Sequence, residues 1–226
     1  MNTIVPFSAV LFDAYGTLLD LGFITEKAEQ AFPGRGAELS ALWRDKQLNY
    51  TWLRTISGNY ADFATVTADA LDYSIERLGL TAPRQKRDDL LAAYWSLPSF
   101  PEVPAALLDL RNKEVRLGIL SNGTPAMLEA ALQSSGLSGL FDDVLSVDAA
   151  GCYKTARAAY QLGPDRLGMP PGRILFVSSN SWDISGATWF GYHTYWVNRG
   201  KHPPERLGTS PHASGETLKD LATLFA

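Results

Sequence analysis

The chain of 226 residues contains a single cysteine and only three histidines. One cysteine excludes both a disulfide framework and a cage of thiolate metal ligands within one chain. The histidines, His193, His202 and His212, lie close to the end of the sequence, which argues against a His-rich metal site. Any chemistry must therefore come mainly from carboxylates, lysine, arginine and hydroxyl groups.

Long apolar runs and blocks of basic residues are also missing. No run approaches the ~20 residues needed to cross a bilayer, and Met1 to Ala9 has no basic residue ahead of its apolar part, unlike a secretory signal. The balance of 20 Lys+Arg against 24 Asp+Glu argues against nucleic-acid binding. We therefore expect a cytoplasmic protein with no nucleic-acid or membrane partner.

What the chain does contain is a series of short apolar runs, which are typical of buried parallel strands. The five runs are residues 8–13, 115–120, 143–147, 173–177 and 192–197. Helical stretches separate the later runs, and one of them has a typical start at Thr124-Pro125 and a plausible stop at Gly136. This alternation predicts an α/β fold with a doubly wound, Rossmann-like parallel sheet.

The segment between the first two runs has a different character. Apolar residues recur with a period near 3.6 in residues 37–54, 62–78 and 84–96, which predicts helices. We expect a helical cap domain of residues 21–98, inserted after the first strand into a discontinuous core domain of residues 1–20 and 99–226. The hinges would lie near 18–22 and 97–103.

Polar residues follow four of the expected strands, at the sheet edge where doubly wound folds bind ligands. They are Asp13, Ser121-Asn122-Gly123, Lys154 and the segment Ser178–Asp183. Each alone has an ordinary explanation as a turn, a helix cap or a solvated side chain, and Asp183 in particular would suit the cap of a helix starting near Ile184. Their coincidence at one edge favours a functional site.

These segments resemble, in order, the motifs of the haloacid dehalogenase superfamily, beginning with Phe12–Leu18 (FDAYGTL). Tyr15, the sequence SSNSWD at 178–183 and the cap segments 41–44 and 50–54 narrow the resemblance to the (S)-2-haloacid dehalogenases. It extends from about residue 8 to residue 200. The resemblance implies hydrolysis of short (S)-2-haloacids to (R)-2-hydroxy acids by a homodimer that uses no metal and no other cofactor.

The resemblance also implies a role for each catalytic group. Asp13 would displace the halide by SN2 attack on C2 and form an aspartyl ester, which water then hydrolyses. Lys154 would favour the ionised form of Asp13, and Asp183 would act as the base for the hydrolytic water. Supporting hydroxyl and amide groups would be Thr17, which orients Asp13, and Ser178 and Asn180, which position the water.

The resemblance implies a halide and substrate site as well. Arg44 from the cap and Asn122 would stabilise the departing halide, and Ser121 with Lys154 would bind the substrate carboxylate. The apolar lining would be Tyr15, Leu48, Phe63 and Trp182, and Tyr160 would be a hydrogen-bonding partner near Lys154. From the residues alone, Arg44 would be a solvated helix residue, and Leu48 and Phe63 would be core.

Two alternatives remain open at this point. A Mg²⁺-dependent phosphatase of the same superfamily would carry a second acid where this chain has Tyr15, and an acidic pair in the segment 178–183, where only Asp183 is acidic. A non-catalytic small-carboxylate binding protein would lack Asp13 or Lys154. One departure from the family pattern is Asp45, where a relative carries Gln, so we expect an acid there to pair with Arg44 or to repel a halide.

Overall fold

A computed structural model describes residues 7–225 and contains one six-stranded, all-parallel sheet in the order β3-β2-β1-β4-β5-β6. The strands are β1 (Ala9–Phe12), β2 (Arg116–Ser121), β3 (Asp143–Ser146), β4 (Ile174–Ser178), β5 (His193–Val197) and β6 (Ala213–Gly215). The five predicted strands and the doubly wound sheet are confirmed. Strand β6 was missed because three residues, Ala-Ser-Gly, carry no strand signal.

The end of β1 lies at the point where the order of the strands reverses: β2 and β3 follow on one side of β1, and β4, β5 and β6 on the other. Strand β1 pairs with β2 on one side and β4 on the other, and Phe12 lies level with Ile119 and Val177. All four β1 side chains are buried. Asp13 therefore leaves the sheet at its topological switch point, where doubly wound folds bind ligands.

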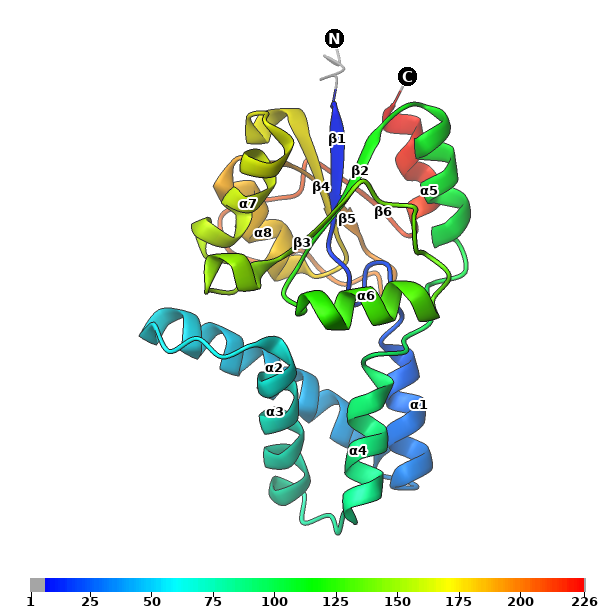
Figure 1. Ribbon diagram of the computed structural model, residues 1–226, viewed down its shortest axis with the longest axis vertical. Coiled ribbons are helices and arrows are strands. Elements are labelled where there is room, and N and C mark those ends of the chain that lie inside the picture. Colours follow the sequence, from blue (N-terminus) through cyan, green and yellow to red (C-terminus); the bar gives the residue numbers. More distant parts are fainter. Residues whose placement is uncertain (1–6, 226) are drawn as a thin grey trace.

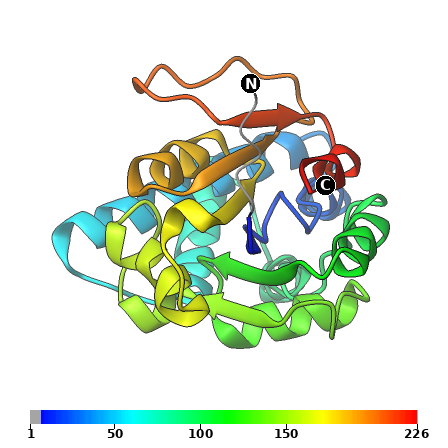
Figure 2. The same ribbon diagram turned by 90° about the horizontal axis from the view of Figure 1, so that it is seen from above.

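Helices cover both faces of the sheet. Helices α7 (Arg157–Leu167) and α8 (Ser181–Phe190) lie on one face, and α5 (Val103–Asn112) with the short 3₁₀ helix η3 (Leu218–Leu224) lies on the other (Figures 1 and 2). Two further 3₁₀ turns are η1 (Val147–Ala150) and η2 (Pro171–Arg173). The start of α6 (Pro125–Ser134) follows the prediction, since the Thr124 hydroxyl accepts a hydrogen bond from the amide of Met127.

Four helices between β1 and α5 form a separate layer beyond the carboxyl ends of the strands (Figure 1). They are α1 (Gly22–Ala31), α2 (Gly36–Ser57), α3 (Phe63–Arg77) and α4 (Arg84–Ala93). Helices α2, α3 and α4 were predicted with slightly different ends, whereas α1 was missed, since no side chain caps its first turn. Trp43 is fully buried among them; it donates to the Thr67 carbonyl (2.8 Å) and packs against Tyr94.

The two connections between these helices and the sheet run side by side. The amide of Asp20 donates to the carbonyl of Pro98 (2.8 Å), and the amide of Phe100 donates to the carbonyl of Leu18 (3.1 Å). We retain the division into a cap of residues 21–98 and a core of 1–20 and 99–226 as a proposal consistent with this pairing. None of the described helices is long and apolar enough to span a bilayer.

Candidate active site

Asp13 is held by three side-chain donors at the end of β1. Its carboxylate accepts hydrogen bonds from Lys154 Nζ (3.0 Å), Thr17 Oγ1 (2.9 Å) and Asn180 Nδ2 (2.9 Å), and it is only 5% exposed. Thr17 is fixed in turn by the amide of Ser179, which donates to its hydroxyl (2.8 Å). The donors fix both carboxylate oxygens in an almost fully buried position, which is an arrangement that a carboxylate nucleophile would require.

Lys154 is completely buried and joins two carboxylates. Its Nζ lies 3.0 Å from Asp13 Oδ1 and 2.8 Å from Asp183 Oδ2, and its amide donates to Asn122 Oδ1 (3.1 Å). Burial lowers the pKa of the ammonium, but the two carboxylates outweigh this effect, so that the pKa of Lys154 is raised above its ordinary value. Lys154 is therefore a permanent cation at neutral pH.

Asp183 is buried in the first turn of α8, with its carboxylate bound by Lys154 and by the Tyr160 hydroxyl (2.7 Å to Oδ1). Burial raises the pKa of Asp183 to about 6, although Lys154 opposes the rise. The alternative that Asp183 is a helix cap is wrong, since α8 already begins at Ser181. The Tyr160 hydroxyl binds Asp183 beside Lys154, and Tyr160 does not line the cavity described below, so a direct role in binding the substrate stays a prediction.

A small cavity lies directly over Asp13, between the cap helices and the sheet. Nine residues line it, and all of them were predicted as site residues: Asp13, Tyr15, Arg44, Leu48, Phe63, Ser121, Asn122, Asn180 and Trp182. Its volume is about 10 Å³, which is room for about one water molecule. Burial raises the pKa of Tyr15 far above its ordinary value, so the phenol is a neutral part of this wall.

Arg44 reaches the cavity from α2 and is held by neutral acceptors. Its Nη1 donates to Gln47 Oε1 (2.8 Å), and its Nη2 donates to Asn180 Oδ1 (3.4 Å). The expected pairing of Arg44 with Asp45 is wrong, because Asp45 is exposed and forms no ion pair within residues 7–225. No carboxylate within residues 7–225 therefore forms an ion pair with the Arg44 guanidinium, which lines the cavity together with Asp13.

Two buried serines shape the turns that carry the site. Ser121 Oγ accepts a hydrogen bond from the Gly123 amide (3.1 Å), and Ser178 Oγ accepts one from the Asn180 amide (3.1 Å). Ser121 also faces the cavity, whereas Ser178 does not. Ser178 was expected to position a water; in the structure it supports the loop that presents Asn180.

Comparisons with known proteins decide the family. A model described as haloacid dehalogenase-like hydrolase matches residues 7–191. The (S)-2-haloacid dehalogenase of Pseudomonas sp. (strain YL) is 43% identical over 216 residues, covering 96% of this chain and 93% of the relative. This chain belongs to the (S)-2-haloacid dehalogenase family.

Solved structures of the dehalogenase family have the same architecture. One L-2-haloacid dehalogenase superposes with a TM-score of 0.95 at 50% identity, covering 97% of this chain and 98% of that one. The L-2-haloacid dehalogenase from Xanthobacter autotrophicus with chloropropionic acid covalently bound superposes with a TM-score of 0.90 at 37% identity. The superposition covers 96% of this chain and 98% of that one. The predicted family membership is confirmed.

Two polar residues that hydrogen-bond to predicted site residues were not themselves predicted from the sequence. Ser179 supports Thr17, and its own hydroxyl donates to the Gly16 carbonyl (2.7 Å). Gln47 holds Arg44 and is fully buried. A signal for Gln47 existed, because residues three apart on a helix lie on the same face.

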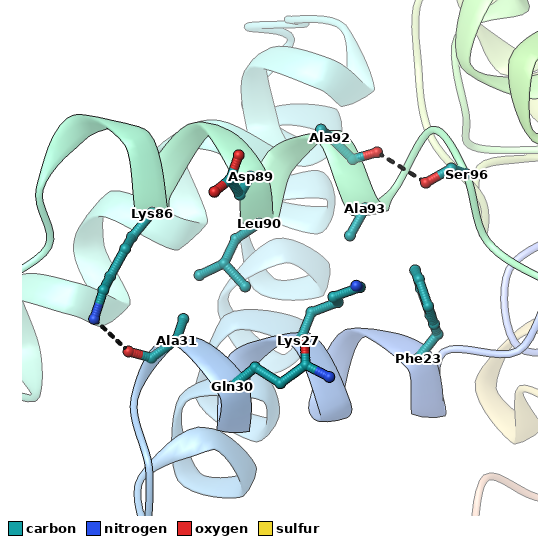
Figure 3. A pocket seen from close by; sticks show the side chains of 10 residues that line it. All are labelled: Phe23, Lys27, Gln30, Ala31, Lys86, Asp89, Leu90, Ala92, Ala93 and Ser96. Atoms are coloured by element: carbon teal, nitrogen blue, oxygen red, sulfur yellow. Dashed lines mark hydrogen bonds between the residues drawn. The ribbon is translucent and has the colours of Figure 1, made fainter.

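A larger cavity of about 520 Å³ lies outside the active site, between α1 and α4 of the cap (Figure 3). Its wall includes the half-buried Lys27 and the exposed Lys86, and Lys86 Nζ donates to the Ala31 carbonyl (2.7 Å). None of the strand-end residues that mark the dehalogenase family lines it. Within residues 7–225, no group of three or more His, Cys, Asp or Glu side chains is arranged to hold a metal ion.

Proposed function

We propose that this protein hydrolyses (S)-2-haloacids to (R)-2-hydroxy acids and halide through an ester on Asp13. The observation that carries the proposal is the placement of Asp13: Asp13 and Arg44 line the same small cavity, and Lys154 Nζ binds the Asp13 carboxylate at 3.0 Å. The dehalogenase relatives, including the one with covalently bound chloropropionic acid, support the same reaction class.

In the first step an Asp13 oxygen attacks C2 of the substrate from the side opposite the halogen. The new O–C2 bond forms as the carbon–halogen bond breaks, and the bonding pair leaves with the halide, so the configuration at C2 is inverted. Negative charge moves from Asp13 to the halogen during this step. Arg44 and Asn122, which line the same cavity, stabilise that charge as it develops.

In the second step water attacks the carbonyl carbon of the ester. Asp183 takes the proton of the water, and the hydroxy acid leaves with the oxygen that Asp13 supplied. The pKa of about 6 suits Asp183 to this work, because the carboxylate is ionised at neutral pH and still a stronger base than an ordinary aspartate. One oxygen of water therefore enters Asp13 in each turnover.

The remaining lining residues select the substrate. Ser121 and the backbone near Asn122 face the substrate carboxylate, and Leu48, Phe63 and Trp182 surround its alkyl group. The cavity is smaller than any haloacid, so entry requires the cap to move away from the sheet or side chains to rotate.

Assembly into a homodimer is part of the proposal. Leu53 and Ile56 near the end of α2 are 55% and 83% exposed, and apolar side chains of this size are suited to a subunit interface. Sedimentation velocity at several protein concentrations measures the state directly, and a monomer at all concentrations would contradict this part.

The decisive experiment compares the two enantiomers of 2-chloropropionate. We expect chloride and (R)-lactate from the (S) enantiomer, no turnover of the (R) enantiomer, and the same rate with EDTA present. Asp13→Asn should abolish chloride release. Retention of configuration would contradict direct displacement, and turnover that requires Mg²⁺ would favour the phosphatase-type alternative. Several turnovers in ¹⁸O-water should label Asp13, whereas an unlabelled Asp13 would indicate direct attack by water.

A further inference from the structure

The side chain of Gln47 lies directly behind Arg44 and is entirely enclosed by protein. It does not line the cavity over Asp13, so it cannot touch a substrate bound there. A fully buried glutamine requires partners for both its carbonyl and its amino group. The identity of those partners shows what the residue does.

The partners of Gln47 form a chain of hydrogen bonds with a single direction. Arg44 Nη1 donates to Gln47 Oε1 (2.8 Å), Gln47 Nε2 donates to Thr67 Oγ1 (2.7 Å), and Thr67 Oγ1 donates to the Phe63 carbonyl (2.6 Å). An arginine can only donate, and the Thr67 hydroxyl proton is already used, so the orientation of the amide is fixed by chemistry. The guanidinium is thereby tied to helix α3.

The neutrality of Gln47 distinguishes Arg44 from the other cation of the site. Lys154 contacts the carboxylates of Asp13 and Asp183, which neutralise its charge. The side-chain hydrogen bonds of Arg44 within the described residues go to the amide oxygens of Gln47 and Asn180. Of the two cations, Arg44 is therefore the one whose hydrogen bonds within the described residues leave it without a carboxylate partner, so it is available to a leaving anion.

We propose that Gln47 is a positioning residue for halide departure: it fixes the Arg44 guanidinium toward the cavity with an acceptor that leaves its charge intact. The inference rests on the proposed function, in which the halide leaves against Arg44. It assigns Gln47 two separable properties, the hydrogen bond that orients the guanidinium and the absence of charge.

Two substitutions separate these properties. Gln47→Glu keeps the shape and the acceptor but adds a negative charge next to Arg44. Gln47→Met keeps the length and the neutrality but removes the acceptor. The matched control is Gln30→Glu, the same chemical change at an exposed position of α1. Thr67→Val, which removes only the far end of the chain of hydrogen bonds, provides a milder variant if the others fold poorly.

The measurement is single-turnover halide release from (S)-2-chloropropionate and (S)-2-bromopropionate, together with inhibition by bromide. Chloride is the poorer leaving group and depends more on stabilisation by Arg44. We expect Gln47→Glu to slow chloride release by about tenfold to a hundredfold. This is less than the roughly hundredfold to thousandfold for loss of one anion-stabilising donor, because Arg44 itself stays in place. Bromide release should slow less, so the bromide-to-chloride rate ratio rises, and bromide should inhibit more weakly.

Gln47→Met should also raise the bromide-to-chloride rate ratio and weaken inhibition by bromide, but by a smaller factor. Thr67→Val should have a still smaller effect, and Gln30→Glu should have none. Folded Gln47 variants with the wild-type ratio and wild-type bromide inhibition would overturn the proposal and leave Gln47 as core packing. A wild-type protein that releases no halide would instead refute the proposed function, so the two failures are distinguishable.

Discussion

Replacing Lys154 by Met removes the one positive charge between two buried carboxylates. Methionine has a similar length and no charge, so the volume is nearly kept while Asp13 and Asp183 lose a donor at 3.0 Å and 2.8 Å. Removing one partner of a buried ion pair costs about 3–5 kcal/mol, because the remaining charge is left uncompensated. For a protein of this size we expect the unfolding temperature to fall by about 6–20 °C.

The same reasoning predicts how this loss depends on pH. In the variant one of the two carboxyl groups retains a proton, as in a carboxylate dyad, so its pKa lies well above the ordinary value. The folded variant then binds more protons than the unfolded chain, and its stability falls as the pH rises. In the wild type the Asp183 pKa is raised only to about 6. The difference in the free energy of unfolding between wild type and variant should therefore increase by about 2 kcal/mol between pH 6 and 8.

Urea unfolding followed by circular dichroism at pH 6 and pH 8 measures the gap directly. The wild-type contribution of Lys154 is constant over this range, because its raised pKa keeps it charged below about pH 10.5. Lys219→Met, at an exposed position, is the control and should change stability by less than about 0.5 kcal/mol. If the difference in the free energy of unfolding is the same at both pH values, the electrostatic reasoning is refuted, and the lost stability is due to packing.

Three further predictions follow from the same geometry. The rate of ester hydrolysis in single turnovers should fall as the pH drops through about 6, because Asp183 must be ionised to accept a proton; a flat profile from pH 5 to 8 would exclude it as the base. Thr17→Val should lower the rate of halide release about tenfold by removing a donor to Asp13, whereas Thr17→Ser should retain most of the rate. Arg87→Ala should cost about 1 kcal/mol or less in urea unfolding, because its pair with Asp72 lies at the surface of the cap and both side chains stay partly exposed.

The sheet and most of the cap were predictable because their signals are local. Buried parallel strands such as Arg173–Val177 appear in the sequence as continuous apolar runs, and Thr124-Pro125 marks a helix start by its own chemistry. Strand β6 and helix α1 lack such signals: the first is three residues of low strand propensity, and the second begins at Leu21 without a side-chain cap. Strand β6 and helix α1 form because of tertiary contacts, and such contacts cannot be recognised in a local sequence pattern.

The candidate site shows a similar division. The strand order brings Asp13, Ser121 and Asn180 to one edge, so their proximity follows from the topology. The cap residues were placed near them by family resemblance alone, because an amphipathic helix shows which face is buried but not what covers it. The expected pairing of Asp45 with Arg44 failed for this reason: adjacent helix residues point in different directions, and Arg44 turns inward while Asp45 faces solvent.

The sequence reveals which charges the site contains, but only the structure shows how they are paired. The charges of Asp13, Asp183, Lys154 and Arg44 sum to zero. A haloacid adds the negative charge of its carboxylate, and in the proposed displacement the charge of Asp13 passes to the leaving halide. Because Lys154 contacts both carboxylates, its attraction for a further anion is largely cancelled. In the proposed mechanism Arg44 is left to stabilise the leaving group, and an acceptor without charge at Gln47 holds the guanidinium in place without opposing that stabilisation.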